Sequence, residues 1–203
     1  MKTDLNQHLI DAWLQMSSWE IIAVILAIAY LVLAVRQNSL CWYCALASTA
    51  IYTVIFWEVQ LLMESALNIY YMLMAIYGWW HWRRGEQRPA LPVQRWHWHR
   101  HALIITGITF ITLTSGVLLS RHTEAAWPFV DSFTTWASVI TTYMVARKVL
   151  ENWYYWMVIN STSMIIFIER ELYLTALLLM TYLIISIFGY IAWRRDYRAM
   201  QYA

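Results

Sequence analysis

Seven apolar runs dominate this chain, and each is close to the ~20 residues that an α-helix needs to cross the hydrocarbon core of a bilayer. They cover roughly 19–35, 40–57, 61–82, 102–120, 130–146, 152–168 and 172–193. Of the 203 residues, 61% are hydrophobic and 13% are charged, which leaves too few charges to cover a soluble protein of this size. The sequence therefore predicts an all-α membrane protein with seven transmembrane helices.

Lysine and arginine fall mainly on one side of these predicted spans. Eleven of the 14 lie on that side: Arg36, Arg83, Arg84, Arg88, Arg95, Arg100, Arg147, Lys148, Arg194, Arg195 and Arg198. The other three are Lys2, Arg121 and Arg170. Because cytoplasmic loops carry the excess of Lys and Arg, we expect a bacterial inner-membrane protein with a periplasmic amino terminus and a cytoplasmic carboxyl terminus. The polar start, 1–18, lacks a small-residue cleavage site and is interpreted as a retained periplasmic lead-in.

The second half of the chain repeats the first at an offset of 111 residues. Residues 36–84 align with 147–195 without a gap, and the identities include Trp, Glu, Gly and a closing Arg-Arg pair. The identical pairs are Arg36/Arg147, Trp42/Trp153, Tyr43/Tyr154, Phe56/Phe167, Glu58/Glu169, Leu61/Leu172, Leu67/Leu178, Tyr71/Tyr182, Ile76/Ile187, Gly78/Gly189, Trp82/Trp193, Arg83/Arg194 and Arg84/Arg195. The first three helices are therefore expected to repeat as the last three, in the same orientation, because one helix separates them.

This repeat predicts the domain organisation. The first three-helix repeat spans 19–82, a basic cytoplasmic loop and a linker helix span 83–120, the second repeat spans 121–193, and 194–203 form a cytoplasmic tail. Parallel repeats related by an axis along the membrane normal occur in transporters, which bind substrate near mid-membrane between the repeats. Gly78 and Gly189 are expected to allow close helix contact.

The two repeats differ at positions that indicate a ligand site. In the sixth predicted helix, Trp153, Trp156, Asn160 and Ser163 share one face. Their counterparts in the first repeat are Trp42, Ala45, Thr49 and Tyr52.

In the third predicted helix, Glu64, Asn68 and Tyr71 share one face, where the second repeat has Thr175, Leu179 and Tyr182. Polar groups inside membranes are costly and usually functional, so Trp156, Asn160, Glu64 and Asn68 are predicted to touch a ligand, with Trp153 and Tyr71 as walls. A hydroxyl stripe on the fifth helix lines the same cavity or bonds back to its own helix; it consists of Thr134, Ser138 and Thr141. The competing interpretation is that all these side chains only pack between helices or extend to the interface.

Such a site suits a flat cation. Aromatic rings stack on a heterocycle and attract positive charge, a carboxylate balances that charge, and Asn offers both a donor and an acceptor. The sequence contains no Walker loop, no H-E-x-x-H motif and no aligned acid–base set, so neither an enzyme nor a bound cofactor or metal is predicted. A membrane enzyme or an assembly subunit, with aromatic rows that serve only packing, is the alternative class.

Two further motifs are given structural interpretations. Cys41 and Cys44 form a C-x-x-C pair without a second pair or nearby ligands, and are interpreted as small apolar residues. The alternating Trp and His residues of 96–101 are interpreted as an interfacial anchor and not as a metal site.

Two motifs resemble a known family, the PnuC vitamin transporters. Residues 151–160, ENWYYWMVIN, are similar to the family's W-x-x-W-x-x-x-[ND] signature, and 77–82, YGWWHW, resemble its Y-G-W-x-x-W motif. Asn68 stands where Gln is frequent in the family. The resemblance extends from the first helix to the final Arg-Arg and implies a 3+1+3 helix arrangement, similar to that of the SWEET sugar transporters.

The same resemblance implies a function. It implies a uniporter without an energy source, linked to a cytosolic kinase that phosphorylates the imported vitamin. The substrate would be nicotinamide riboside, or thiamine as in the PnuT branch; both are aromatic cations, and the residues do not separate them. The expected partners are this vitamin, the lipid bilayer and further copies of the chain, without nucleic acid.

Overall fold

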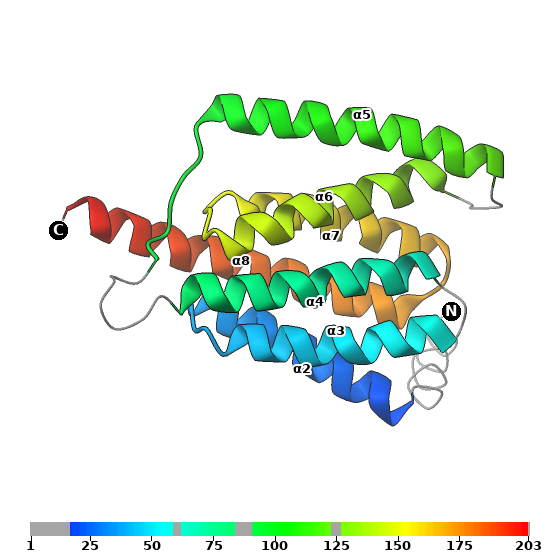
Figure 1. Ribbon diagram of the computed structural model, residues 1–203, viewed down its shortest axis with the longest axis horizontal. Coiled ribbons are helices and arrows are strands. Elements are labelled where there is room, and N and C mark those ends of the chain that lie inside the picture. Colours follow the sequence, from blue (N-terminus) through cyan, green and yellow to red (C-terminus); the bar gives the residue numbers. More distant parts are fainter. Residues whose placement is uncertain (1–16, 59–61, 84–90, 123–126, 203) are drawn as a thin grey trace.

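The computed structural model describes residues 17–58, 62–83, 91–122 and 127–202. Within them the chain forms seven α-helices: α2 (Ser18–Val35), α3 (Cys41–Glu58), α4 (Leu62–Trp82), α5 (Trp98–His122), α6 (Pro128–Ala146), α7 (Asn152–Glu169) and α8 (Tyr173–Gln201). Figure 1 shows them lying side by side along one axis, with α5 at one edge. The seven-helix membrane fold predicted from the sequence is confirmed. The predicted lead-in lies almost entirely outside the described residues.

Two helices extend beyond the apolar runs that predicted them. The helix α8 continues through the segment expected to be a tail and ends only at Gln201, and α5 begins at Trp98, inside the expected loop. Hydropathy marks where a helix leaves the bilayer, but not where it ends. Arg, Met and Gln are good helix formers and continue α8 beyond its apolar part.

Three of the described helices, α2, α5 and α8, are long and apolar enough to cross a membrane by length and composition alone. The other four carry more Ser, Thr, Tyr, Trp and Asn, which lowers their hydropathy. Those polar residues face other helices at several positions, because Ser48, Asn68, Thr141 and Asn160 are all buried inside the protein.

The helix contacts follow an approximate two-fold symmetry. Within the first three helices, α2 packs on α3 and α3 on α4; within the last three, α6 packs on α7 and α7 on α8. Between the two sets, α4 contacts α6, and its symmetry equivalent α8 contacts α2. The linker helix α5 packs mainly on α6 and has no counterpart in this pattern.

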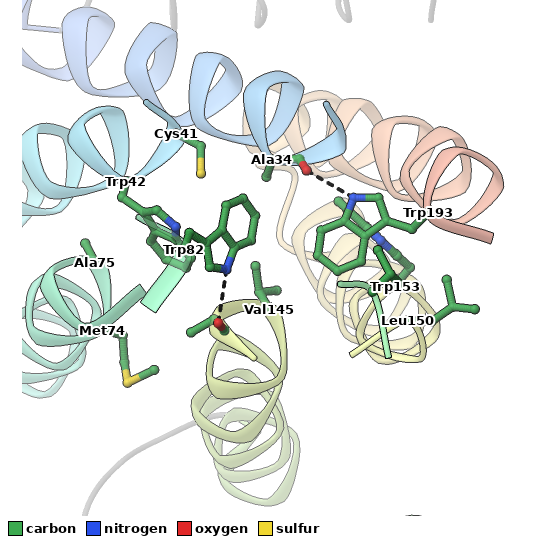
Figure 2. Packing of buried hydrophobic residues seen from close by; sticks show 12 residues of the cluster. Ala34, Cys41, Trp42, Met74, Ala75, Trp82, Val145, Leu150, Trp153 and Trp193 are labelled. Atoms are coloured by element: carbon green, nitrogen blue, oxygen red, sulfur yellow. Dashed lines mark hydrogen bonds between the residues drawn. The ribbon is translucent and has the colours of Figure 1, made fainter. Parts of the chain in front are cut away.

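Four tryptophans join the two sets of helices at the end that carries Arg36, Arg83, Arg147 and Arg194, which we call the arginine end. This tryptophan layer consists of Trp42, Trp82, Trp153 and Trp193 (Figure 2). Trp42 and Trp82 meet edge to face at 5.2 Å, and the equivalent pair, Trp153 and Trp193, meets at 5.3 Å. The first pair contacts the second through Trp82 and Trp193, at 6.1 Å between ring centroids.

Two hydrogen bonds from this layer cross between the repeats. Nε1 of Trp82 donates to the carbonyl of Ala146 at 3.0 Å, and Nε1 of Trp193 donates to the carbonyl of Ala34 at 3.1 Å (Figure 2). Both acceptors lie in the last turn of a helix, where carbonyls lack intrahelical partners. Each repeat therefore caps the first helix of the other.

The two predicted close-contact glycines lie under this layer. Gly78 packs against the ring of Trp42, and Gly189 lies equally close to the ring of Trp153. A Cβ atom on Gly189 would lie 2.6 Å from that ring, inside van der Waals contact. The repeat alignment thus matched the glycine and its facing tryptophan in both halves.

Three helices end in the same hydrogen-bonded turn. After α2, α6 and α7, the first residue beyond the C-cap has a left-handed backbone: Gln37 (φ 54°), Lys148 (φ 51°) and Glu171 (φ 60°). In each case this residue and the next donate N–H groups back into the last helical turn, which is the Schellman pattern. Glycine usually occupies such a position because side chains are strained there. Here all three residues carry long polar side chains.

The segment before α5 is fixed against the turn between α6 and α7. Gln94 N–H donates to the carbonyl of Lys148 at 3.0 Å, and Leu150 N–H donates to the carbonyl of Gln94 at 2.8 Å. Arg95 Nε donates to Glu151 Oε1 at 2.7 Å. The described part of the basic loop is therefore a strap over the arginine end, which the sequence did not predict.

Candidate functional site

A small cavity lies between the two sets of helices, and we call it the central cavity. Its volume is about 120 Å³, and five helices line it, namely α2, α3, α4, α6 and α7. The lining residues are Ala27, Tyr30, Trp42, Ala45, Ser48, Thr49, Tyr71, Thr142 and Trp156. The cavity thus combines aromatic rings with hydroxyl groups, although these are not the hydroxyls of Thr134, Ser138 and Thr141 that the sequence selected.

The hydroxyl groups of this cavity give it a definite electrostatic character. Ser48 donates to the carbonyl of Ala23 at 2.8 Å, Thr49 to the carbonyl of Ala45 at 2.8 Å, and Thr142 to the carbonyl of Ser138 at 2.8 Å. Because each hydroxyl proton is used by a backbone carbonyl, the oxygen offers only its lone pairs to a ligand. These three hydroxyls therefore offer acceptors to a ligand with donors or positive charge.

Two of the predicted site residues, Trp156 and Tyr71, line the central cavity. Asn160 lies one turn further along α7, is 5% exposed and has no side-chain hydrogen bond within the described residues. A buried amide without a protein partner is expected to face a ligand or water. Asn68 is also buried, but its amide nitrogen donates to the carbonyl of Glu64 at 2.9 Å, which leaves mainly its oxygen available.

The other predicted residues lie away from the cavity lining. Glu64 is exposed in the first turn of α4. Trp153 is 1% exposed and belongs to the tryptophan layer. Thr134 donates to the carbonyls of Val130 and Asp131 on its own helix, which is one of the two alternatives given for the hydroxyl stripe.

The two remaining predicted residues also lie outside this lining. Ser138 is buried on α6 and interacts with Tyr71, next to the cavity. Ser163 is half-buried further along α7. The third residue of the hydroxyl stripe, Thr141, is buried and donates to the carbonyl of Ala137 at 2.6 Å.

Sequence reasoning missed most of the cavity lining, above all the residues of α2 and α3. The lining residues it did not select are Ala27, Tyr30, Trp42, Ala45, Ser48 and Thr49 in the first repeat and Thr142 in the second. A signal was present, because Trp42, Ala45 and Thr49 are the repeat counterparts of Trp153, Trp156 and Asn160. A two-fold axis between the repeats places equivalent positions on equivalent walls. The stripe on α7 therefore implied a matching stripe on α3.

A second cavity, which we call the lateral cavity, lies between α5, α6 and α7 and has a volume of about 440 Å³. Most of its lining is aliphatic or aromatic, including Ile105, Ile108, Phe133 and Val158. It is larger than the central cavity, but it lies to one side of the repeat interface. The central cavity is the better candidate site, because both repeats line it and because it carries the polar groups that select a ligand.

The His-rich segment meets a carboxylate that is distant in sequence. Nδ1 of His101 lies 3.0 Å from the Tyr155 hydroxyl, and Nε2 lies 3.8 Å from Glu151 Oε2. No group of three or more His, Cys, Asp or Glu side chains suited to a metal ion occurs among the described residues. Cys41 and Cys44 are both free thiols, and Cys41 is fully buried among the helices.

Comparison with known proteins identifies similar chains. Residues 17–195 match the model of a family described as nicotinamide mononucleotide transporter. The nicotinamide riboside transporters PnuC of Escherichia coli (strain K12) and Shigella flexneri are each 25% identical over 187 residues, which cover 79% of this chain and 78% of theirs. The riboflavin/roseoflavin transporter RibM of Streptomyces davaonensis is 25% identical over 93 residues, 44% of each chain.

A solved structure has the same fold. The crystal structure of the vitamin B3 transporter PnuC superposes with a TM-score of 0.74 at 20% identity, covering 96% of this chain and 88% of that one. The 3+1+3 arrangement expected from the sequence is therefore found in a transporter of known structure.

Proposed function

This chain belongs to the nicotinamide mononucleotide transporter family, and we propose that it is a facilitator that carries an aromatic, cationic vitamin precursor across the inner membrane. Nicotinamide riboside is the first substrate to test, and thiamine is the second. The family is one of transporters, and the fold is that of a multi-pass membrane protein.

The observation that carries this proposal is the lining of the central cavity. Tyr30, Tyr71 and Trp156 supply aromatic faces, and the hydroxyls of Ser48, Thr49 and Thr142 supply acceptors. A pyridinium or thiazolium ring is flat and positive, so it gains both stacking and cation–π contact with such rings. The carboxamide and ribose hydroxyls of the riboside, or the aminopyrimidine of thiamine, bring the donors that these acceptors require.

The size of the cavity indicates that substrate binding requires movement. At about 120 Å³ the cavity is smaller than the roughly 300 Å³ at the lower end of small-molecule sites. The helices around it must separate to admit a nucleoside. This agrees with alternating access, in which one repeat rocks against the other around a central site.

Glu64 was predicted from its helix face to touch the ligand, but its position in the structure favours a role outside the cavity. It is exposed near the end of the bundle opposite the arginine end, where Arg170 and Glu64 both act on the carboxyl group of Asp131. We propose that the two carboxylates attract a cation to the mouth of the path instead of binding it in the cavity. Asn68 and Asn160 are proposed to contact the substrate.

Uptake measurements test the facilitator proposal. In proteoliposomes without ATP or an imposed ion gradient, and with the membrane potential held at zero because the substrate is a cation, labelled nicotinamide riboside should enter until its internal and external concentrations are equal. Empty liposomes give the control rate, and thiamine is measured in parallel. Uptake that appears only after a proton or sodium gradient is imposed would make the protein a coupled pump.

We also propose that the arginine end faces the cytoplasm, where a vitamin kinase would trap the imported substrate. The proposal rests on the excess of Lys and Arg at that end. In a background without Cys41 and Cys44, an impermeant maleimide added to intact cells should label Glu171→Cys and spare Arg198→Cys. The opposite labelling pattern would invert the orientation.

A further inference from the structure

Two equivalent residues of the repeats bind each other at the arginine end. Gln37 and Lys148 are 111 positions apart, and each is the left-handed residue after the first helix of its repeat. Nζ of Lys148 donates to Oε1 of Gln37 at 3.1 Å, and Nε2 of Gln37 donates to Oδ2 of Asp196 on α8 at 2.7 Å. Residues related by a two-fold axis contact each other only where they lie close to that axis.

The ammonium group of Lys148 is held in a costly position. Lys148 is 5% exposed, and Nζ lies 4.7 Å from the centroid of the Trp82 ring. Burial lowers the pKa of Lys148 to about 8, because it disfavours the charged form. A buried charge is retained only where partners compensate for lost hydration. Here the compensation comes from Gln37, the Trp82 ring and the nearby Asp196.

The left-handed backbone at Gln37 and Lys148 indicates that their side chains do more than form the turn. A left-handed backbone is strained for a non-glycine residue and persists where other interactions hold it. Glycine would make the same turn without that strain. The turn at Glu171, which has an exposed side chain, shows that the motif itself does not need an interaction between repeats.

This contact lies on the side of the central cavity that faces the arginine end. Trp42 lines the cavity, Trp82 packs edge to face on Trp42, and the ammonium of Lys148 lies over Trp82. The tryptophan layer and the pair of Lys148 and Gln37 thus form a continuous set of contacts from the cavity wall to the arginine end.

We propose that Lys148, Gln37 and Asp196 form a latch that holds the two repeats together at the arginine end and must open in each transport cycle. The inference rests on the proposed transport function. The latch joins the first helix of each repeat, and those helices separate when one repeat rocks against the other. Breaking it exposes the cavity to the arginine side, and reforming it closes that side again.

The test measures access to the cavity without using any vitamin. Thr49→Cys, in a background without Cys41 and Cys44, places one thiol in the cavity wall. An impermeant maleimide is added to membrane vesicles that present the arginine end, identified as those in which Arg198→Cys reacts. Gln37→Gly and Lys148→Gly each remove one latch side chain and suit the left-handed backbone. Each should raise the labelling rate of Thr49→Cys about tenfold, because each removes a hydrogen bond to a charged group.

Glu171→Gly is the matched control, because it removes a side chain from a turn of the same type that lies outside the latch. Its labelling rate should equal that of the parent. Unchanged labelling in Gln37→Gly would overturn the proposal even if Lys148→Gly does not reach the membrane. Equal increases in all three variants would also overturn it, because they would show general loosening. Faster labelling in a protein that takes up no vitamin would refute the transport proposal and leave the latch intact.

Discussion

Replacing Gly189 with Ala should lower the free energy of unfolding by about 1–3 kcal/mol, which is the usual cost of overpacking a core. The new Cβ would lie 2.6 Å from the ring of Trp153, which is 1% exposed and packs edge to face on Trp193. Gly78→Ala should act in the same way against Trp42. Thermal unfolding of the purified protein in detergent measures both effects.

The chain provides a matched control for this prediction. Gly107 lies inside α5, and a Cβ there meets nothing within 4 Å. Gly107→Ala should therefore raise stability slightly, by about 0.5–1 kcal/mol, because Ala is the better helix former. If all three substitutions raised the melting temperature equally, α4 and α8 would not approach the tryptophan layer as closely as the structure shows.

The second large effect is expected on ligand binding. Trp156→Ala should weaken binding of the substrate about tenfold or more, because stacking and cation–π contact are worth roughly 1–2 kcal/mol when desolvated, and ~1.4 kcal/mol is a factor of ten. Trp156 lines the central cavity, and its repeat counterpart there is Ala45, so the wall that faces Trp156 by symmetry carries no equivalent ring. Equilibrium titration of the purified variant measures the change in Kd.

Trp80→Ala serves as the control for that titration. Trp80 lies on α4, 65% exposed on the outside of the bundle, and its removal should leave Kd unchanged. Equal losses in Trp80→Ala and Trp156→Ala would show that tryptophan removal weakens the whole protein. Wild-type affinity in Trp156→Ala would move the site to the hydroxyl groups of α3 and α6.

The sequence predicted the fold well because the repeat constrains it at several independent points. The alignment paired Trp82 with Trp193 and Gly78 with Gly189, and the structure gives both members of each pair the same contacts. Hydropathy placed most helix ends within a few residues, but not the end of α8, because a polar segment can remain helical in water. The domain boundaries drawn from the repeat remain a prediction.

The site was predicted only in part, for a physical reason. Divergence between the repeats identified Trp156 on α7, but it was not applied to α2 and α3, which supply most of the remaining lining residues. Helical faces were also assigned without helix tilt and packing, so Glu64 was predicted to touch the ligand, whereas it is exposed in the first turn of α4 and does not line the central cavity. The strap at Gln94 and the latch at Lys148 depend on contacts between distant segments, which a spacing pattern does not contain.

The central claim is that the cavity between the repeats binds an aromatic cation, and direct titration of the wild-type protein tests it. Nicotinamide riboside should bind saturably, whereas an uncharged analogue of the same shape, such as its dihydropyridine form, should bind markedly more weakly because it lacks the cation–π contribution. If thiamine bound more tightly than nicotinamide riboside, the proposed site would stand and thiamine would be the substrate. No saturable binding of either cation, or equal affinity for the charged and uncharged forms, would contradict the account.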